Sequence, residues 1–256
     1  MSFKRIGQVA TYKPLARCDM EELAAHYGHG YNPSGGVLFA RTGDREQKDI
    51  ARKSIIELFT LSAWPDHLSI LTMPSAEWRF ENKLLGRREG DWFRRGGPSK
   101  TRITGIENDR LIYYSAVTKM PGLQTRRALV RSVPAPTFAE QGVRTKFVGA
   151  FYFANVDDLM AETTEAWDAV WLDYTGPLSL ERMRIIKNFY QRSVRQILIV
   201  TSLKARWNKD TSAAIERAGG HSEWLRNHLE GDVLHDIEYM DTSPMAQFAV
   251  RHKEPA

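Results

Sequence analysis

The stretch that most constrains the fold runs from Ala169 to Pro177 and reads AVWLDYTGP. Its first four residues are apolar without alternation, which is typical of a central strand covered on both faces. Asp173 follows at the carboxyl end of this strand, and Gly176 and Pro177 then break the chain. The pattern predicts a buried strand that ends on an acid and opens into a tight loop.

A helix and a second strand follow this loop. Ser179 is a suitable N-cap for a helix from about Leu180 to Gln191, and residues 196–201 form another apolar run. Strand, loop, helix and strand make a parallel crossover unit, and open parallel sheets bind ligands outside the carboxyl ends of their strands. Asp173 is therefore a candidate ligand-binding residue. The alternative is a solvated acid before a helix, where acids are common.

Three earlier segments repeat the order of strand and polar loop, namely 68–72, 101–107 and 147–153. The second ends on Glu107, and a carboxylate at a strand end suits the hydroxyl groups of a ribose, although a solvated acid is the alternative. Asp157 or Asp158 is a predicted cap for the helix after the third. The loop after the first leads into a helix that Pro74 or Ser75 would open.

The other segments complete an α/β pattern. Residues 44–63 carry apolar residues at helical spacing, and residues 118–145 read as a long insertion or poorly periodic loop. The runs 233–240 and 245–250 are joined by a short connection, which predicts an antiparallel pair. Residues 1–43 are predicted to be an N-terminal extension or lid, and residues 44–256 the α/β domain.

The chain is basic, with 36 Lys and Arg against 31 Asp and Glu, and the excess is clustered. Arg94 and Arg95 belong to one cluster and Lys204 and Arg206 to another, and such clusters favour a phosphate-rich partner. An ordinary soluble basic surface is the alternative. Cys18 is the only cysteine, so a disulfide framework and a cysteine zinc site are excluded and a cytoplasmic location is expected.

Neither a membrane nor a metal partner is expected. The sequence has no apolar run long enough to cross a bilayer and no signal-peptide pattern at Met1. His26 and His29 lie in a glycine-rich loop without further ligands at metal spacing, which favours a mobile lid over a metal site. No G-x-G-x-x-G follows an early strand and no phosphate-binding G-x-x-x-x-G-K motif occurs, which argues against dinucleotide oxidoreductases and P-loop enzymes.

The succession of strands from Leu68 to His252, closed by an antiparallel pair, resembles class I S-adenosylmethionine-dependent methyltransferases. The resemblance implies a Rossmann-like, doubly wound, mostly parallel sheet with a C-terminal antiparallel hairpin. It also implies S-adenosylmethionine as cofactor. The cofactor-binding residues that it implies are Thr72, Met73, Pro74, Ser75, Glu107, Asn155, Val156, Asp157 and Asp173. The family's first loop is normally glycine-rich, because the backbone passes close to the cofactor, whereas residues 72–77 contain no glycine.

Asp173 and Tyr174 are the candidate catalytic residues. The Asp173 carboxylate can accept a bond from the acceptor's amino group, and the Tyr174 ring can stack on a base or face the sulfonium. With Arg94, Arg95, Lys204 and Arg206 as phosphate-binding residues, the acceptor is predicted to be RNA or DNA. Three alternatives stay open, namely a methyltransferase-like domain without catalysis that binds nucleic acid or has a structural role, a methyltransferase for a small molecule or protein, and another doubly wound enzyme. The oligomeric state does not follow from the sequence.

Overall fold

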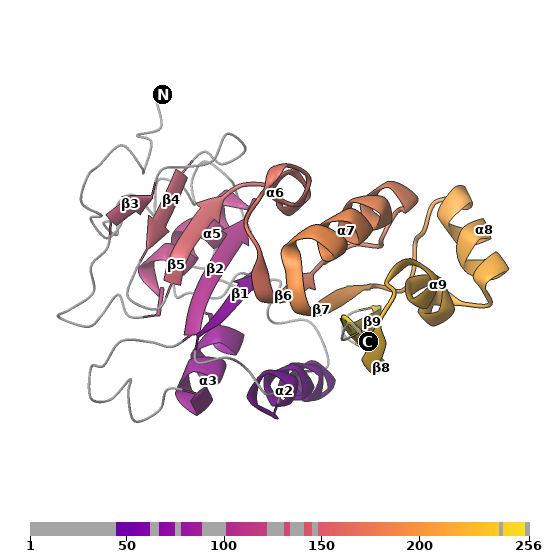
Figure 1. The fold of residues 1–256 in the computed structure, drawn as a ribbon, viewed down its shortest axis with the longest axis horizontal. Helices are drawn as coiled ribbons and strands as arrows, with labels where there is room; N and C mark the ends of the chain where they lie inside the picture. The colour runs from indigo at the N-terminus through magenta and orange to yellow at the C-terminus, as the bar shows by residue number, and fades with distance from the viewer. Residues whose placement is uncertain are drawn as a thin grey trace. The chain divides into compact units, whose positions relative to one another are not determined.

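Figure 1 shows the computed structural model, which describes residues 45–61, 67–74, 78–88, 101–121, 131–133, 141–144, 148–240 and 243–253. The chain divides into two compact units. Unit 1 contains the described residues from 56 to 68 and from 73 to 159, and unit 2 those from 45 to 55, 69 to 72 and 160 to 253. The predicted boundary between residues 43 and 44 lies outside the described residues and remains a prediction.

The described strands of unit 1 follow the order β3-β4-β5-β2. β5 (Val148–Phe153) pairs in parallel with β2 (Thr101–Glu107). On its other side β5 pairs antiparallel with β4 (Gln141–Arg144), which pairs antiparallel with β3 (Arg131–Val133). β3 and β4 lie in the segment expected to be a poorly periodic loop. That expectation was wrong at these residues, because strands of three and four residues are too short to show a clear alternation.

Two helices of unit 1, α3 (Arg79–Arg88) and α5 (Arg110–Thr118), contact β2. Together with β2 and β5 they enclose a core dominated by aromatic and branched side chains, which are Trp78, Leu85, Ile103, Tyr113, Ala116, Val117, Met120, Val148, Phe151 and Phe153. Tyr113 stacks on Phe151 with ring centroids 4.6 Å apart. The core therefore lies between the two helices and one face of β2 and β5.

The strands of unit 2 follow the order β1-β6-β7-β9-β8. The first three, β1 (Leu68–Thr72), β6 (Trp167–Asp173) and β7 (Val194–Leu203), are parallel. β9 (Pro244–Arg251) runs antiparallel to β7, and β8 (Asp232–Met240) runs antiparallel to β9. The predicted parallel crossover and the C-terminal antiparallel pair are confirmed.

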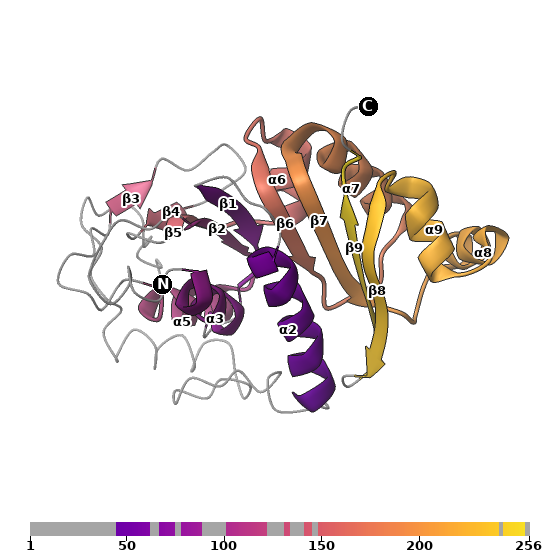
Figure 2. The same cartoon turned by 60° about the horizontal axis from the view of Figure 1, so that its bottom comes forward.

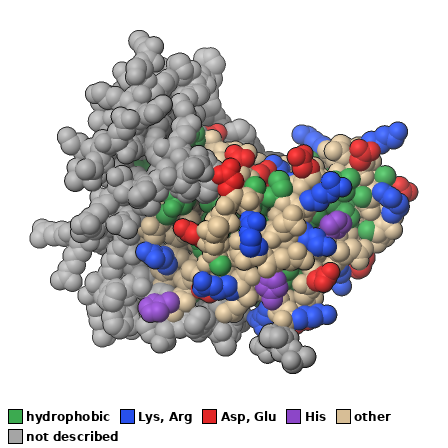
Figure 3. Space-filling view, turned by 45° about the horizontal axis from the view of Figure 1, so that its top comes forward, with side chains coloured by type: hydrophobic (Ala, Val, Ile, Leu, Met, Phe, Trp, Pro, Cys, Tyr) green, Lys and Arg blue, Asp and Glu red, His purple; other side chains and the backbone are tan. Residues whose placement is uncertain are grey.

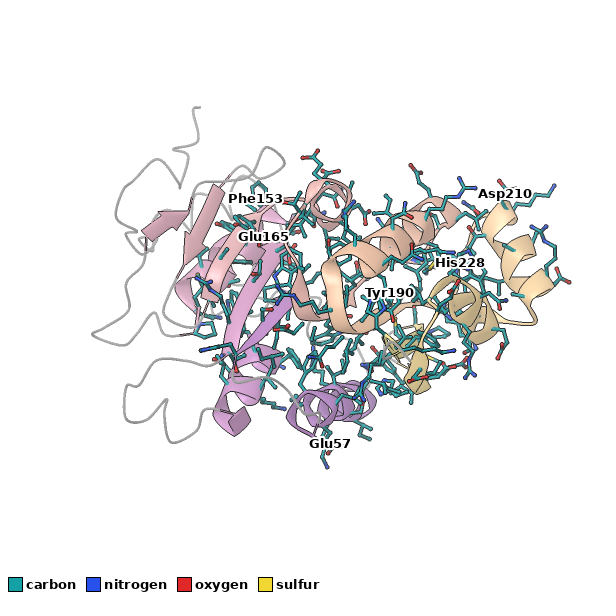
Figure 4. All side chains as sticks on the ribbon, in the orientation of Figure 1. Glu57, Phe153, Glu165, Tyr190, Asp210 and His228 are labelled. Atoms are coloured by element: carbon teal, nitrogen blue, oxygen red, sulfur yellow. The ribbon has the colours of Figure 1, made fainter. Side chains whose placement is uncertain are left out.

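Helices cover both faces of this part of the sheet. α7 (Leu180–Ser193) contacts β7, and its buried side chains are Met183, Ile186, Phe189, Tyr190 and Ser193. Figure 2 shows the first half of α2 (Arg45–Leu61) along the opposite face. Figure 4 draws the packed side chains, with Tyr190 labelled on α7. The fold is a Rossmann-like, doubly wound α/β fold with a mostly parallel sheet and a C-terminal antiparallel hairpin, as predicted.

Two helices of unit 2 have side-chain caps. Ser179 caps α7 as predicted, because its side-chain oxygen accepts a hydrogen bond from the Arg182 amide at 3.1 Å. α8 (Lys209–Ala218) is capped by Asn208, whose Oδ1 accepts from the Thr211 amide at 2.8 Å. Asp210 lies in the first turn of α8, where an acid interacts favourably with the helix dipole. α9 (His221–His228) then packs on α8.

β6 carries one acid at each end, and the acid at the amino end is structural. Asp168 is buried and accepts hydrogen bonds from the Ser69 amide at 2.7 Å and the Ser69 hydroxyl at 2.8 Å. Arg195 of β7 also pairs with it at 3.2 Å. Asp168 therefore links β1, β6 and β7 at their amino ends, which leaves Asp173 as the acid at the ligand-binding edge.

Candidate functional site

In unit 1, the strand-end acid Glu107 has an environment that strongly alters its ionisation. Its side chain is half-buried, and its Oε1 accepts a hydrogen bond from the Asp109 amide at 2.8 Å. Burial raises the pKa of Glu107 from 4.5 to about 7, against the lowering effect of that hydrogen bond. A carboxyl group that titrates near neutrality at the carboxyl end of a parallel strand is a candidate ligand-binding group.

The next polar loop of unit 1 follows β5 and begins α6 (Val156–Glu162). Asn155 caps this helix, because its Oδ1 accepts from the Asp157 amide at 3.0 Å, so the expectation that Asp157 or Asp158 is the cap was wrong. Asp157 lies in the first turn with a half-buried side chain, whereas Val156 is buried. The Ala154 amide also donates to the Glu107 carbonyl at 3.1 Å, which ties the ends of β5 and β2 together.

The loop after β1 contains Met73 and Pro74, and Ser75 lies outside the described residues. Pro74 is buried against β2 at Gly105. A Cβ at position 105 would lie 3.1 Å from Pro74 Cγ and 2.8 Å from the Phe151 ring, so this close packing requires glycine. The glycine that permits the approach is therefore on the neighbouring strand and not in the loop itself.

The loop ends at Trp78, which has a backbone φ of 50°. This left-handed conformation is strained for a residue with a Cβ, and it explains why α3 begins at Arg79 and not near Pro74 as expected. The ring is fully buried, its Nε1 donates to the Ala116 carbonyl at 2.8 Å, and it meets Phe151 edge-on at 4.9 Å. These contacts hold the turn that a glycine would make without strain.

In unit 2, Asp173 ends β6 and lines a small pocket on the face covered by α2. Thr72, at the end of β1, is fully buried, and its Oγ1 has no hydrogen-bond partner among the described residues. Asp173 is opposite Thr201 of β7 in the sheet register, and Thr201 is opposite Gln247 of β9. The residues that line the pocket are Ala51, Arg52, Ile55, Trp171, Asp173, Thr201, Tyr239 and Gln247.

Tyr174 does not join Asp173 at this pocket. It is buried, and the guanidinium carbon of Arg182 on α7 lies 4.6 Å from its ring centroid. Neighbouring residues at a strand end point to opposite faces, so Asp173 lies on the α2 face while Tyr174 packs against α7. The structure thus separates the two residues that the sequence suggested as a catalytic pair.

The pocket also contains residues that the sequence reading did not select, and Gln247 is the most informative. It lies in the apolar run Met245–Val250 and is only 1% exposed. A single amide side chain inside a buried strand is a signal, because buried polar groups are costly unless they have a partner. Arg52 could not be singled out from the sequence, because α2 contains other basic residues.

The basic cluster of unit 2, Lys204 and Arg206, includes an acidic neighbour that the sequence did not predict. Lys204 forms an ion pair with Glu238, whereas Arg206 is exposed and has a left-handed backbone with φ of 61°. Trp207 stacks on His221 at 5.5 Å, and burial together with the nearby Lys204 charge lowers the pKa of His221 to about 4. The face shown in Figure 3 has Lys and Arg interspersed with Asp and Glu. Arg94 and Arg95 lie outside the described residues.

In the part of the chain that the structure describes, no group of three or more His, Cys, Asp or Glu side chains is placed to hold a metal ion. Among the same residues, no helix combines the length and apolar character needed to cross a bilayer.

Several solved structures are similar in fold to this chain. A SAM-dependent methyltransferase from Aquifex aeolicus has a TM-score of 0.45 and 8% identity over 93% of this chain and 100% of its own. A protein from Clostridium thermocellum, provisionally named an rRNA methylase, has a TM-score of 0.47 and 9% identity over 82% and 97%. The cyclase SpnF has a TM-score of 0.49 and 13% identity over 84% of each chain. No protein-family model matches the sequence, and no curated protein matches it.

The fold assignment itself rests on the strand pairings of this chain, in which β9 enters antiparallel beside the parallel strand β7. One fold can host several reactions, so the functional information lies in the residues at the strand ends.

Proposed function

We propose that this chain is an S-adenosylmethionine-dependent methyltransferase that acts on nucleic acid. The observation that carries the proposal is the placement of acids at the carboxyl ends of parallel strands, Glu107 on β2 of unit 1 and Asp173 on β6 of unit 2. Ligands of doubly wound folds bind at these strand ends. The C-terminal antiparallel pair is the further feature that the resemblance to methyltransferases implies.

The residues of unit 1 fit the cofactor's polar groups. The half-buried Glu107 carboxylate suits a pair of ribose hydroxyls, because hydrogen-bond donors that reach a desolvated carboxylate stabilise its ionised form. Asn155, Val156 and Asp157 would border the adenine, and Met73, Pro74 and Ser75 would hold the amino-acid part. Thr72 and Asp173 belong to unit 2, and the buried, unpartnered Thr72 hydroxyl is a suitable polar contact.

When bound, the cofactor supplies an electrophilic methyl group, so the protein mainly has to position the acceptor. Asp173 is suited to this role, because its carboxylate can accept a hydrogen from the acceptor and orient the reacting atom. Tyr174, packed beneath Arg182, would hold the loop after β6 rather than touch the acceptor.

A nucleic-acid acceptor is supported by the basic clusters. Arg206 is exposed in the loop after β7, the same loop that presents Lys204. Contacts of this kind to phosphates give affinity with little sequence information, and that affinity falls steeply as salt increases. Arg94 and Arg95, which lie outside the described residues, are proposed as further phosphate-binding residues.

Calorimetry with S-adenosylmethionine is the first test, and transfer of labelled methyl to total RNA and to DNA is the second. We expect binding by the wild type, weaker binding by Glu107→Ala, and salt-sensitive retention of RNA or DNA. Salt-insensitive or absent nucleic-acid binding, together with cofactor binding, would indicate a small-molecule or protein acceptor.

The second candidate function is a methyltransferase-like module that binds nucleic acid without catalysis. The observation that favours it is the lack of glycine in residues 72–77, which precede the packed, left-handed Trp78. For such a module we expect no cofactor binding at millimolar concentration while nucleic-acid binding persists. Calorimetry on the wild type therefore separates the two functions.

A further inference from the structure

The loop after β7, residues 204–208, is held at both ends by contacts within unit 2. At its start, the Lys204 amide donates a hydrogen bond to the Pro244 carbonyl at 2.8 Å. At its end, Asn208 is the N-cap of α8. Between these anchors, Arg206 has a left-handed backbone, a conformation that a residue with a Cβ keeps only where its surroundings fix it. The loop therefore has a defined conformation before any ligand binds.

Trp207 of this loop is stacked on α9. Its ring is nearly parallel to that of His221, with 20° between the ring planes and 5.5 Å between the centroids. His221 lies 5.9 Å from Trp224, and both of these residues are buried. Neither ring nitrogen of His221 has a hydrogen-bond partner among the described residues, so aromatic contacts rather than hydrogen bonds hold this ring. One face of Trp207 thus has a rigid aromatic support.

Trp207 differs from the other tryptophans in its exposure. It is half-buried, whereas the remaining tryptophans that the structure describes are all buried, namely Trp78, Trp167, Trp171 and Trp224. The Nε1 of Trp207 is nevertheless buried, so the indole offers no hydrogen-bond donor to a ligand. Such a side chain recognises a partner through its ring surface, by stacking or apolar contact.

Positive charge surrounds this ring in the chain. Arg206 directly precedes Trp207 and is exposed, and Lys209 is exposed at the start of α8. Lys204 is paired with Glu238, which leaves two cations against Asp210 in residues 205–210. An aromatic ring between exposed cations matches a strand of nucleic acid, in which bases and phosphates alternate.

The loop after β7 also borders the loop after β6. The Leu203 amide donates to the Gly176 carbonyl at 3.1 Å, which joins the two loops at the carboxyl edge of the parallel strands. Asp173, which is proposed to position the acceptor, ends β6 at this same edge. A nucleotide on Trp207 would therefore lie on the side of unit 2 where the reaction is proposed. Enzymes that modify a base need that base out of the helical stack.

We infer that Trp207 is a stacking platform for an unpaired base, and that the nucleic acid bound at this loop is single-stranded. The inference rests on the proposed function and narrows its acceptor to an unpaired segment of RNA or DNA. His221 is a positioning residue, because it supports the inner face of the Trp207 ring. Arg206 contacts a neighbouring phosphate. In a duplex the faces of the bases are already stacked on one another, so a duplex can use Arg206 but not Trp207.

The first experiment measures the affinity of a short labelled RNA, as a single strand and as the duplex of the same sequence, by fluorescence anisotropy at several salt concentrations. We expect tighter binding of the single strand. Trp207→Leu should weaken single-strand binding about 5- to 100-fold and leave duplex binding and the salt slope unchanged, because no charge is lost. Arg206→Ala should instead weaken both forms and lower the slope. The matched control is Ile50→Ala, which removes an exposed apolar side chain of α2 and should change neither affinity.

The second experiment follows the intrinsic tryptophan fluorescence. A base stacked on an indole quenches its emission, so the single strand should quench the wild type and the duplex should not. Trp207→Phe keeps an aromatic ring and should bind the single strand within a few-fold of the wild type, yet lose most of the quenching. Should Trp207→Leu fail to fold, as judged by its melting temperature, this variant decides the role of Trp207.

Three outcomes would overturn the inference while leaving nucleic-acid binding intact. They are equal affinity of the wild type for single strand and duplex, an equal loss of both affinities in Trp207→Leu, and full quenching in Trp207→Phe. A wild type that binds the cofactor but neither form of RNA or DNA would instead reject the nucleic-acid acceptor, and the inference with it. Absence of cofactor binding together with a single-strand preference would support Trp207 as the platform and reject the methyltransferase reaction.

Discussion

The candidate ligand-binding residues of unit 1 and those of unit 2 differ in their backbone and surroundings. In unit 1, Trp78 has a strained, left-handed backbone and a ring packed against Phe151, and Glu107 is partly desolvated at the end of β2. In unit 2, Asp173, Thr201 and Gln247 lie opposite one another on the regular strands β6, β7 and β9. The comparison teaches that aromatic packing can hold a backbone conformation that favours glycine, whereas strand register alone brings polar side chains from distant segments onto one face.

The largest expected effect is a loss of stability on replacing Trp78, the residue of unit 1 with the strained backbone. Trp78→Ala removes a fully buried ring and should destabilise the protein by about 3–5 kcal/mol in chemical denaturation. Trp78→Gly should be about 1 kcal/mol less destabilising than Trp78→Ala, because glycine adopts a positive φ without strain. If Trp78→Gly were more destabilising than Trp78→Ala, the left-handed turn would not be a source of strain.

The next largest effect is a loss of activity on replacing Asp173, at the end of the regular strand β6 in unit 2. Asp173→Ala should lower the rate of methyl transfer to RNA or DNA at least about 100-fold, because the acceptor loses its orienting hydrogen bond. Affinity for nucleic acid should change little. Asp168→Ala is the comparison variant, since Asp168 is bonded to Ser69 and Arg195 and should cost stability rather than turnover. Full activity in Asp173→Ala would remove this residue from the site.

Glu107 provides a pH test of unit 1. The folded protein holds a proton on Glu107 between pH 4.5 and about 7 that the unfolded chain has released, so this group makes stability fall as the pH rises through that window. Glu107→Gln cannot ionise and should be more stable than wild type by about 1–3 kcal/mol near pH 8, with no gain near pH 4. Denaturation curves at both pH values measure this difference, and an equal effect at both would contradict it.

The same titration should appear in cofactor binding. If the ionised Glu107 accepts the ribose hydroxyls, the affinity of the wild type should fall about tenfold for each pH unit below about 7. Glu107→Gln should bind more weakly at neutral pH and lose this pH dependence. Calorimetry across the pH range is the measurement, and a parallel pH profile in the variant would assign the titration to another group.

The smallest effect belongs to the basic loop of unit 2. Arg206→Ala should weaken RNA or DNA binding to a similar degree for all sequences and reduce the slope of log affinity against log salt by about one. Lys204→Ala should have a smaller effect, because Lys204 already pairs with Glu238. A larger loss for Lys204→Ala would mean that nucleic acid displaces Glu238 from this pair.

Much of the fold was determined by local sequence patterns. The apolar run before Asp173, the Ser179 cap and the stripe along α7 specify strand, loop and helix through contacts near in the chain, and all appear as predicted. Asp173 and Glu107 were located for the same reason, since each follows directly on a strand. The short strands β3 and β4 were missed because β4 is stabilised by pairing with β5, and β3 by pairing with β4, rather than by a pattern of their own.

Only the tertiary structure decided which side chains share a face and which residue makes room for another. Tyr174 follows Asp173 in the chain, yet it packs under Arg182, because side-chain direction alternates along a strand. Gln247 lies 74 residues after Asp173 and reaches the same pocket through the register of β6, β7 and β9. Gly105 accommodates Pro74 from a neighbouring strand. These relations depend on pairings between distant segments, which no local pattern of residues encodes.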